Sequence, residues 1–202
     1  MAEKTKVIVD TDFMNYMMRA KGDKDFYFNK LVEDLNIEPV VHEFLYNKEM
    51  MGNPLVAKLV RENKLIVMKY GDFLADLNDI YYSMLFADLY KYCNGRDLEY
   101  GKTNFRTYQE AEANLGEIHS VILALYTNYP VFLSNDNGVK AMVQTKINTT
   151  KYCLTVKNVM DVLEEIAIRE KTALTKRDFV NLTKGDSGRK NKIQEIKNKW
   201  VD

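Results

Sequence analysis

The chain has 202 residues, of which 46% are hydrophobic and 29% are charged, and its basic and acidic residues balance at 29 each. This composition is typical of a globular protein with a sizeable core and excludes an intrinsically disordered chain. The apolar runs fall far short of the roughly 20 residues of a membrane span, and the N-terminus lacks a signal-peptide pattern. We therefore expect a cytoplasmic protein that does not enter a membrane.

The charge is unevenly distributed along the chain. Residues 171–202 carry nine lysines and arginines against four acids, so this end is basic and the remainder is acidic. No linker rich in Pro, Gly or Ser divides the chain, and we predict one domain over residues 1–185 with a basic C-terminal tail over 186–202. Such a tail permits a polyanionic partner.

In the first half, KVIVD at 6–10 is a run of β-branched residues that predicts a short buried strand. Apolar residues in 37–45 recur at i, i+3, i+4, i+7 and i+8, which predicts an amphipathic helix with Glu43 outside its apolar stripe. LIVMKY at 65–70 predicts a second strand, and the stretch 73–92 predicts a long helix.

In the second half, strands and helices alternate. Helices are expected at 116–126, 137–145 and 158–169, with strands at 131–134 and 153–156. Strands separated by helices of this length imply a parallel sheet with helices on both faces. We therefore predict a three-layer α/β/α fold around a central twisted parallel sheet, with ligands at the carboxyl ends of its strands.

Three acids are expected to meet at that edge of the sheet. Asp10 ends the first strand, and Asp136 follows the strand at 131–134. Glu117 begins a helix whose length is matched by the returning strand, which brings it near Asp136. Converging carboxylates repel one another unless a cation neutralises them, and oxygen ligands select Mg²⁺ or Mn²⁺.

Four blocks containing these acids resemble, in order and spacing, the PIN domain. The blocks are VIVDTDF at 7–13, VVHEFL at 40–45, LGEIHSVILAL at 115–125 and FLSNDNGVKAM at 132–142. The resemblance covers roughly residues 5–170. It adds Glu43 to the site, and it departs from the family at Gly138, where many PIN domains have a further acid.

The resemblance implies a metal-dependent endoribonuclease, close to the toxin endonucleases, in which a metal-activated water hydrolyses RNA. As substrate, single-stranded RNA is favoured over duplex RNA. The resemblance is also compatible with an inhibitory partner protein and with a homo-oligomer. The implied catalytic and metal-binding residues are Asp10, Glu43, Glu117 and Asp136, with Mg²⁺ or Mn²⁺ as cofactor. The implied supporting residues are Thr11, Asp12, Ser134, Asn135 and Asn137.

Two other functions remain open. Gly138 at the usual acidic position motivates a catalytically weak PIN-like protein that binds nucleic acid or serves as a scaffold. The pair Asp10 and Asp12, two residues apart after a strand, also occurs in HAD-type phosphatases, although Met14 and the downstream sequence do not follow that pattern.

The same acids also have purely structural interpretations. Asp10 and Asp12 could cap a helix, Asn114 and Glu117 have the spacing of a capping box, and Asp136 begins a typical turn sequence. Glu43 could be a solvated helix residue. His42 and His119 are expected on the surface or in the core rather than as ligands, because neighbouring helical positions point in different directions.

Overall fold

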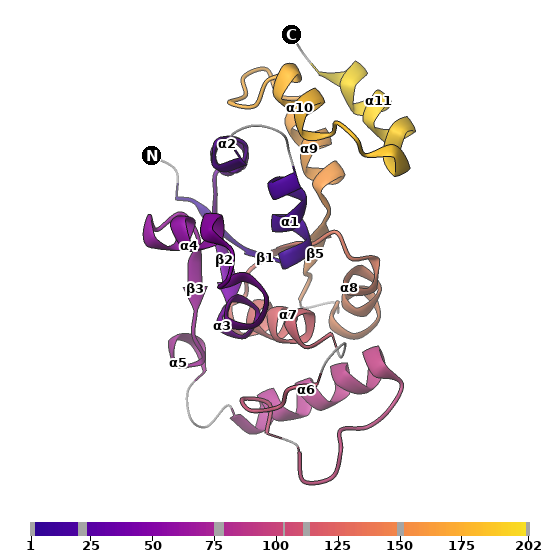
Figure 1. Ribbon diagram of the computed structural model, residues 1–202. Helices are drawn as coiled ribbons and strands as arrows, with labels where there is room; N and C mark the ends of the chain where they lie inside the picture. The colour runs from indigo at the N-terminus through magenta and orange to yellow at the C-terminus, as the bar shows by residue number, and fades with distance from the viewer. Residues whose placement is uncertain are drawn as a thin grey trace.

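A computed structural model describes residues 3–19, 24–74, 79–102, 104–110, 114–148 and 152–200. A five-stranded, all-parallel sheet lies between two layers of helices (Figure 1). The predicted three-layer α/β/α fold is therefore confirmed. Within the described ranges, every helix is too short or too polar to cross a membrane.

The strand order places two carboxyl ends at a topological switch point. In the sheet the order is β3-β2-β1-β4-β5. The chain moves outward from β1 to β3 and then returns to the other side of β1. The helix after β1 therefore covers one face of the sheet, and the helix after the neighbouring strand β4 covers the other. The strands are β1 (Thr5–Val9), β2 (Ile37–His42), β3 (Ile66–Met68), β4 (Val131–Leu133) and β5 (Thr155–Lys157).

The helices over one face of the sheet bury a largely aliphatic core. Val7 and Val9 of β1 and Val41 of β2 point into this core. Its helices are α1 (Thr11–Arg19), α2 (Lys24–Leu35), α4 (Pro54–Arg61), α9 (Val159–Ala167), α10 (Lys176–Leu182) and α11 (Lys190–Lys199).

The opposite face is covered by a second core, which is rich in aromatic residues. Ile8 of β1, Val40 of β2 and Phe132 of β4 point into it. Its helices are α5 (Tyr70–Phe73), α6 (Asp79–Asn94), α7 (Leu115–Thr127), α8 (Asn137–Met142) and the π-helix η3 (Val143–Ile147) that continues α8.

The helix predicted over 73–92 is observed from Asp79 onward, with residues 75–78 outside the described chain, whereas the helix predicted over 37–45 is wrong. The segment 37–45, which we expected to be an amphipathic helix, forms strand β2 as far as His42 and only then turns into α3 (Glu43–Leu45) and the π-helix η1 (Tyr46–Met50). The strand is buried on both faces, with Val40 in one core and Val41 in the other. Apolar residues are therefore needed at nearly every position, and their helical spacing is coincidental.

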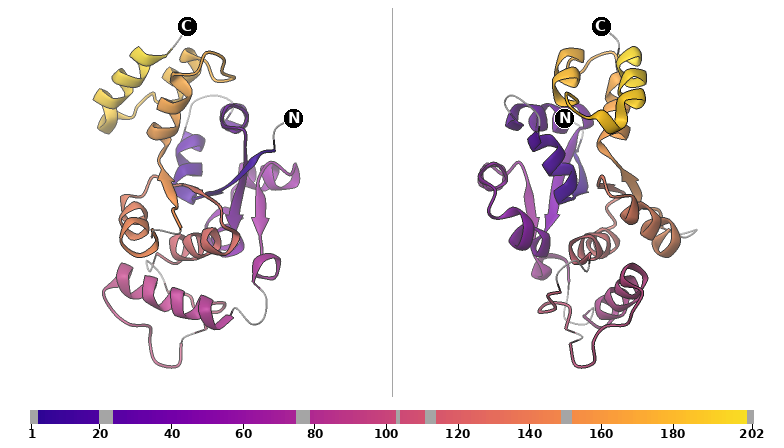
Figure 2. Two further views of the ribbon diagram at one scale, coloured as in Figure 1. Left: turned by 180° about the vertical axis from the view of Figure 1, so that it is seen from behind. Right: turned by 45° about the vertical axis from the view of Figure 1, so that its right-hand side comes forward.

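The basic C-terminal segment folds onto the aliphatic core. It forms the 3₁₀ turn η4 (Ser187–Arg189) and α11, and Ile196 is completely buried. Trp200 is 6% exposed, and its ring lies 5.1 Å from that of Phe179. Figure 2 shows these orange and yellow helices gathered at the end of the molecule opposite the magenta α6. The basic side chains are thus carried by an ordered helix.

Candidate active site at the switch point

Asp10 lies directly after β1 and is only 2% exposed. The Ser134 hydroxyl, which follows β4, donates a hydrogen bond to Asp10 Oδ2 at 2.7 Å. Burial raises the pKa of Asp10 to about 7, the hydrogen bond from Ser134 opposes this, and the charges of Glu117 and Asp12 raise the pKa further. Asp10 is therefore a carboxyl group for which the charged form is unfavourable.

Glu117 lies in the first turn of α7 and is also affected by neighbouring acids. Burial raises its pKa, and the charges of Glu49, Asp136 and Asp12 act in the same direction. Together with Asp10, these residues form a group of like charges at the carboxyl edge of the sheet, which we call the carboxylate cluster. Its members are Asp10, Asp12, Glu49, Glu117 and Asp136.

Glu49 is a member that the sequence did not predict. It lies in η1, which contacts the start of α7 at Gly116. A Cβ atom at Gly116 would collide with Leu45 and would lie 2.9 Å from Glu49 Oε1. Glycine therefore allows the two helices to approach closely, and this approach brings Glu49 to Glu117.

Glu43 is the predicted acid with a different partner. Its Oε1 accepts a hydrogen bond of 2.5 Å from the backbone N–H of Tyr70, at the start of α5. Its charge contributes, after burial, to raising the pKa of Tyr70. Glu43 thus fixes the connection that follows β3, whereas Glu49, further along the same helical segment, faces the other acids.

The loop between β4 and α8 connects the parts of the cluster. The Ser134 hydroxyl that donates to Asp10 also accepts from the backbone N–H of Asp136 at 3.1 Å. Asn135 Nδ2 donates to the Asp12 carbonyl at 3.2 Å, and Asn135 Oδ1 accepts from the backbone N–H of Val159 at 3.0 Å. Ser134 and Asn135 therefore link the starts of α1, α8 and α9 by hydrogen bonds.

The remaining predicted supporting residues, Thr11 and Asn137, have no side-chain contact within the part of the chain that the structure describes that connects them with the carboxylate cluster. Asn137 is exposed at the start of α8. Thr11 is half-buried at the start of α1, and its Oγ1 has no hydrogen-bond partner among the described residues. No contact in the described chain assigns either side chain to the cluster.

Of the two structural roles considered for Asp136 and Glu117, one is observed and the other is not. Asp136 does cap α8, because its Oδ1 accepts from the backbone N–H of Gly138 at 2.6 Å. The capping box expected at Glu117 is not formed, since Asn114 has a left-handed φ of 51° and its side chain makes no cap hydrogen bond. A Cβ atom at Gly138 would lie 3.1 Å from Asp136 Oδ1, the atom that accepts this hydrogen bond.

A cavity of about 260 Å³ opens beside two of the acids. Glu117 and Asp136 line it together with Cys93, Asn114 and Met142. Burial raises the pKa of the Cys93 thiol to about 11, and the charges of Glu117 and Asp136 add to this effect. Cys93 is therefore protonated at neutral pH and is not an activated nucleophile.

The cluster fits a divalent cation in donor chemistry, because carboxylate oxygens are the ligands that Mg²⁺ and Mn²⁺ prefer. Across the described ranges, however, no three or more His, Cys, Asp or Glu side chains are close enough together to enclose a metal ion. The side chains would have to turn toward one another to share a cation.

The two histidines beside the acids belong to the aromatic core. His42 and His119 are fully buried, and their rings stack at 5.1 Å. His42 Nδ1 accepts from the backbone N–H of Phe44 at 3.0 Å, and His119 Nδ1 lies 2.6 Å from the Tyr82 hydroxyl. Burial lowers the pKa of His42 to about 3, so it remains neutral.

Comparisons of the chain with family models, with curated proteins and with solved structures found no match.

Proposed function

We propose that this protein is a nuclease that binds Mg²⁺ or Mn²⁺ at the carboxylate cluster and hydrolyses the phosphodiester bonds of RNA. The observation that carries the proposal is the mutual influence of the clustered acids. Burial and the charges of neighbouring carboxylates raise the pKa values of Asp10 and Glu117. None of the groups that shift these two pKa values most is a lysine or an arginine.

Carboxylates gathered in this way lower the stability of the folded protein unless a cation is bound. Clusters of acids with perturbed pKa values are typical of active and metal-binding sites. The cluster also lies where ligands of parallel sheets collect, next to the switch point between β1 and β4. The resemblance to PIN domains, which rests on blocks that contain Asp10, Glu117 and Asp136, supplies the choice of RNA as substrate.

A divalent cation, when bound, would lower the pKa of a water molecule and stabilise negative charge on a phosphate. Asp10 would release its proton and offer a carboxylate held in place by Ser134. Glu117 and Asp136 would complete the site from the side of the cavity. Glu49 replaces Glu43 in this assignment, because Glu43 is occupied by the backbone of Tyr70.

The two alternatives differ in what they require of Asp10 and of the metal. An HAD-type phosphatase needs Asp10 as an accessible nucleophile, and a side chain that is 2% exposed and hydrogen bonded to Ser134 is poorly placed for attack. A catalytically weak PIN-like binding protein is favoured by Gly138 and by the spread of the acids in the described chain. It predicts RNA binding without metal binding.

Calorimetric titration with Mn²⁺ tests the proposal directly. We expect the wild type to bind Mn²⁺ and to cleave single-stranded RNA, leaving 5′-phosphate and 3′-hydroxyl ends, with EDTA abolishing cleavage. Glu117→Gln and Asp136→Asn should each weaken Mn²⁺ binding by at least about tenfold, since even outer-shell partners of a metal contribute about 10–100-fold.

Glu33→Gln is the matched control, because Glu33 is an exposed acid near the end of α2, at the amino end of β2. It should bind Mn²⁺ and cleave RNA as the wild type does. Absence of Mn²⁺ binding in the wild type, with and without RNA, would remove the nuclease proposal. Cleavage that ignores EDTA and leaves cyclic phosphates would exclude the metal-activated water.

A further inference from the structure

A basic loop follows α10 and leads into α11. It spans residues 184–192, KGDSGRKNK, and includes η4 and the first three residues of α11; we call it the 184–192 loop. It holds four basic residues and one acid, Asp186. Gly185 has a φ of +93°, a conformation that side-chain-bearing residues rarely adopt, so glycine permits the turn after α10. The loop concentrates positive charge where the chain bends.

Two hollows flank this loop. One, of about 550 Å³, lies against the start of α9 and is lined by Asn158, Asp161, Lys190 and Lys192. The other, of about 540 Å³, lies against α1 and is lined by Tyr16 and Lys184. Both are also lined by the same part of η4, namely Ser187, Gly188 and Arg189.

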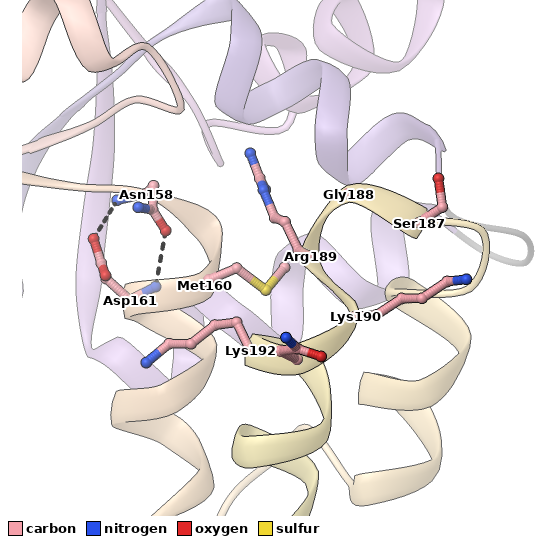
Figure 3. Close-up of a pocket in the computed structure, with 9 residues that line it drawn as sticks. Asn158, Met160, Asp161, Ser187, Gly188, Arg189, Lys190 and Lys192 are labelled. Atoms are coloured by element: carbon pink, nitrogen blue, oxygen red, sulfur yellow. Dashed lines mark hydrogen bonds between the residues drawn. The ribbon is translucent and has the colours of Figure 1, made fainter.

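Arg189 has an unused donor at the wall between these hollows. Its guanidinium lies 5.5 Å from the centre of the Tyr16 ring, and Nη1 forms an ion pair with Asp186 Oδ2 at 3.8 Å, a distance too long for a hydrogen bond. Nη1 is buried without a hydrogen-bond partner among the residues that the structure describes. Figure 3 shows the Arg189 side chain extending from η4 beside the start of α9, where Asn158 and Met160 lie. A planar guanidinium, with its several donors, is well suited to a phosphate group.

The neighbouring lysines differ in their partners. Lys192 points toward α9 (Figure 3), and its ammonium group lies 2.5 Å from Glu164 Oε2. Lys190 is exposed and forms no ion pair within the described chain. Lys190 therefore offers an anionic ligand a positive charge that has no acidic partner in the described chain, and Arg189 adds a charge that is paired with Asp186 only at 3.8 Å.

The 184–192 loop is structurally connected to the carboxylate cluster. Asn158, which lines the larger hollow, precedes Val159, whose backbone N–H donates to Asn135 Oδ1. Asn135 in turn donates to the Asp12 carbonyl. The larger hollow, at the start of α9, is therefore linked through Asn135 to Asp12 at the start of α1.

We infer that the 184–192 loop, through Arg189 and Lys190, binds backbone phosphates of the single-stranded RNA that the carboxylate cluster acts on. This inference rests on the proposed function. An acidic cluster repels a nucleic acid, and a basic contact beside it offsets that repulsion and fixes the strand. The ligand is recognised by its phosphates, so the contact is independent of base sequence.

The test is the salt dependence of RNA binding, measured by fluorescence anisotropy of a 5′-labelled single-stranded RNA in EDTA, where no metal-dependent cleavage occurs. Each lost phosphate contact lowers the slope of log affinity against log salt by about 0.7 for a single strand. We expect Arg189→Gln and Lys190→Gln each to reduce the slope by about that amount. Lys190→Gln alters an exposed side chain and keeps the test valid if Arg189→Gln fails to fold.

Lys197→Gln is the matched control, because Lys197 is exposed on α11 and lines neither hollow. Its slope should equal that of the wild type. Slopes unchanged in the Arg189 and Lys190 variants, or reduced equally in all three, would overturn the inference while leaving Mn²⁺ binding and cleavage untouched. Reduced slopes in a protein that binds no Mn²⁺ would keep the phosphate contact and reject the nuclease.

Discussion

The carboxylate cluster and the surface between α9 and α11 both gather charged side chains, but the consequences for the charges are opposite. In the cluster, Asp10 and Glu117 are buried near other carboxylates, and their pKa values rise. Between α9 and α11, hydrogen bonds from Lys192 and Lys199 lower the pKa of Glu164. Like charges are thus concentrated in one region, and opposite charges are paired in the other.

This difference separates a candidate site from a structural contact. Paired charges at a surface stabilise the fold weakly and need no ligand. Buried like charges reduce stability, and groups whose pKa values are perturbed in this way are concentrated at functional sites. The expected effects of neutralising one acid therefore have opposite signs in the two regions.

The largest effect is expected at Asp10. In EDTA at pH 8, Asp10→Asn should raise the free energy of unfolding by about 4 kcal/mol, because asparagine avoids the cost of ionising a buried carboxyl whose pKa is about 7 rather than 3.8. Urea denaturation measures this difference. Because the pKa of Asp10 is raised in the folded protein, the contribution of its protonated form to stability is fully present below pH 3.8 and is lost as the pH rises through about 7. The two proteins should therefore converge in acid.

Saturating Mn²⁺ sharpens the same comparison. At one hundred times its dissociation constant, a ligand stabilises the folded protein by about 2.7 kcal/mol. The wild type should gain this amount and Asp10→Asn should gain less, as measured by melting curves with and without metal. Equal gains in both proteins would contradict a cation site at Asp10.

A second pair of variants distinguishes Glu43, at the start of α3, from Glu49, within η1. Glu43→Ala should lower the free energy of unfolding by about 1–3 kcal/mol, because the N–H of Tyr70 loses its acceptor, and should leave Mn²⁺ affinity unchanged. Glu49→Gln should do the reverse, weakening Mn²⁺ binding without loss of stability in EDTA. If Glu43→Ala alone weakened Mn²⁺ binding, Glu43 rather than Glu49 would belong to the site.

The smallest effect is expected at Glu164. Glu164→Gln removes the partner of Lys192 and Lys199 and should lower the free energy of unfolding by at most about 1 kcal/mol, since the pairs are partly exposed. Adding salt should shrink the difference further. A stabilising effect, as expected for Asp10→Asn, would show that the two regions do not differ as proposed.

The sequence alone determined the fold class and the edge of the sheet at which two of the acids lie. Strands and helices alternate, so the parallel sheet followed, and with it the positions of Asp10 and Asp136 just beyond the carboxyl ends of β1 and β4. The spacing of charged residues also revealed the basic C-terminal end. These features are local in the chain, or they depend only on the period of a strand or a helix.

Only the tertiary structure decided the parts that depend on burial and on contacts between distant segments. β2 is buried on both faces and therefore lacks the alternation that identifies a half-exposed strand, so the sequence predicted a helix over 37–45. The helical turns that carry Glu49 in fact begin only after His42. The approach of η1 to Gly116 then places Glu49, and not Glu43, beside Glu117. The basic segment became an ordered helix because Ile196 and Trp200 find space in the aliphatic core, which no pattern within that segment specifies.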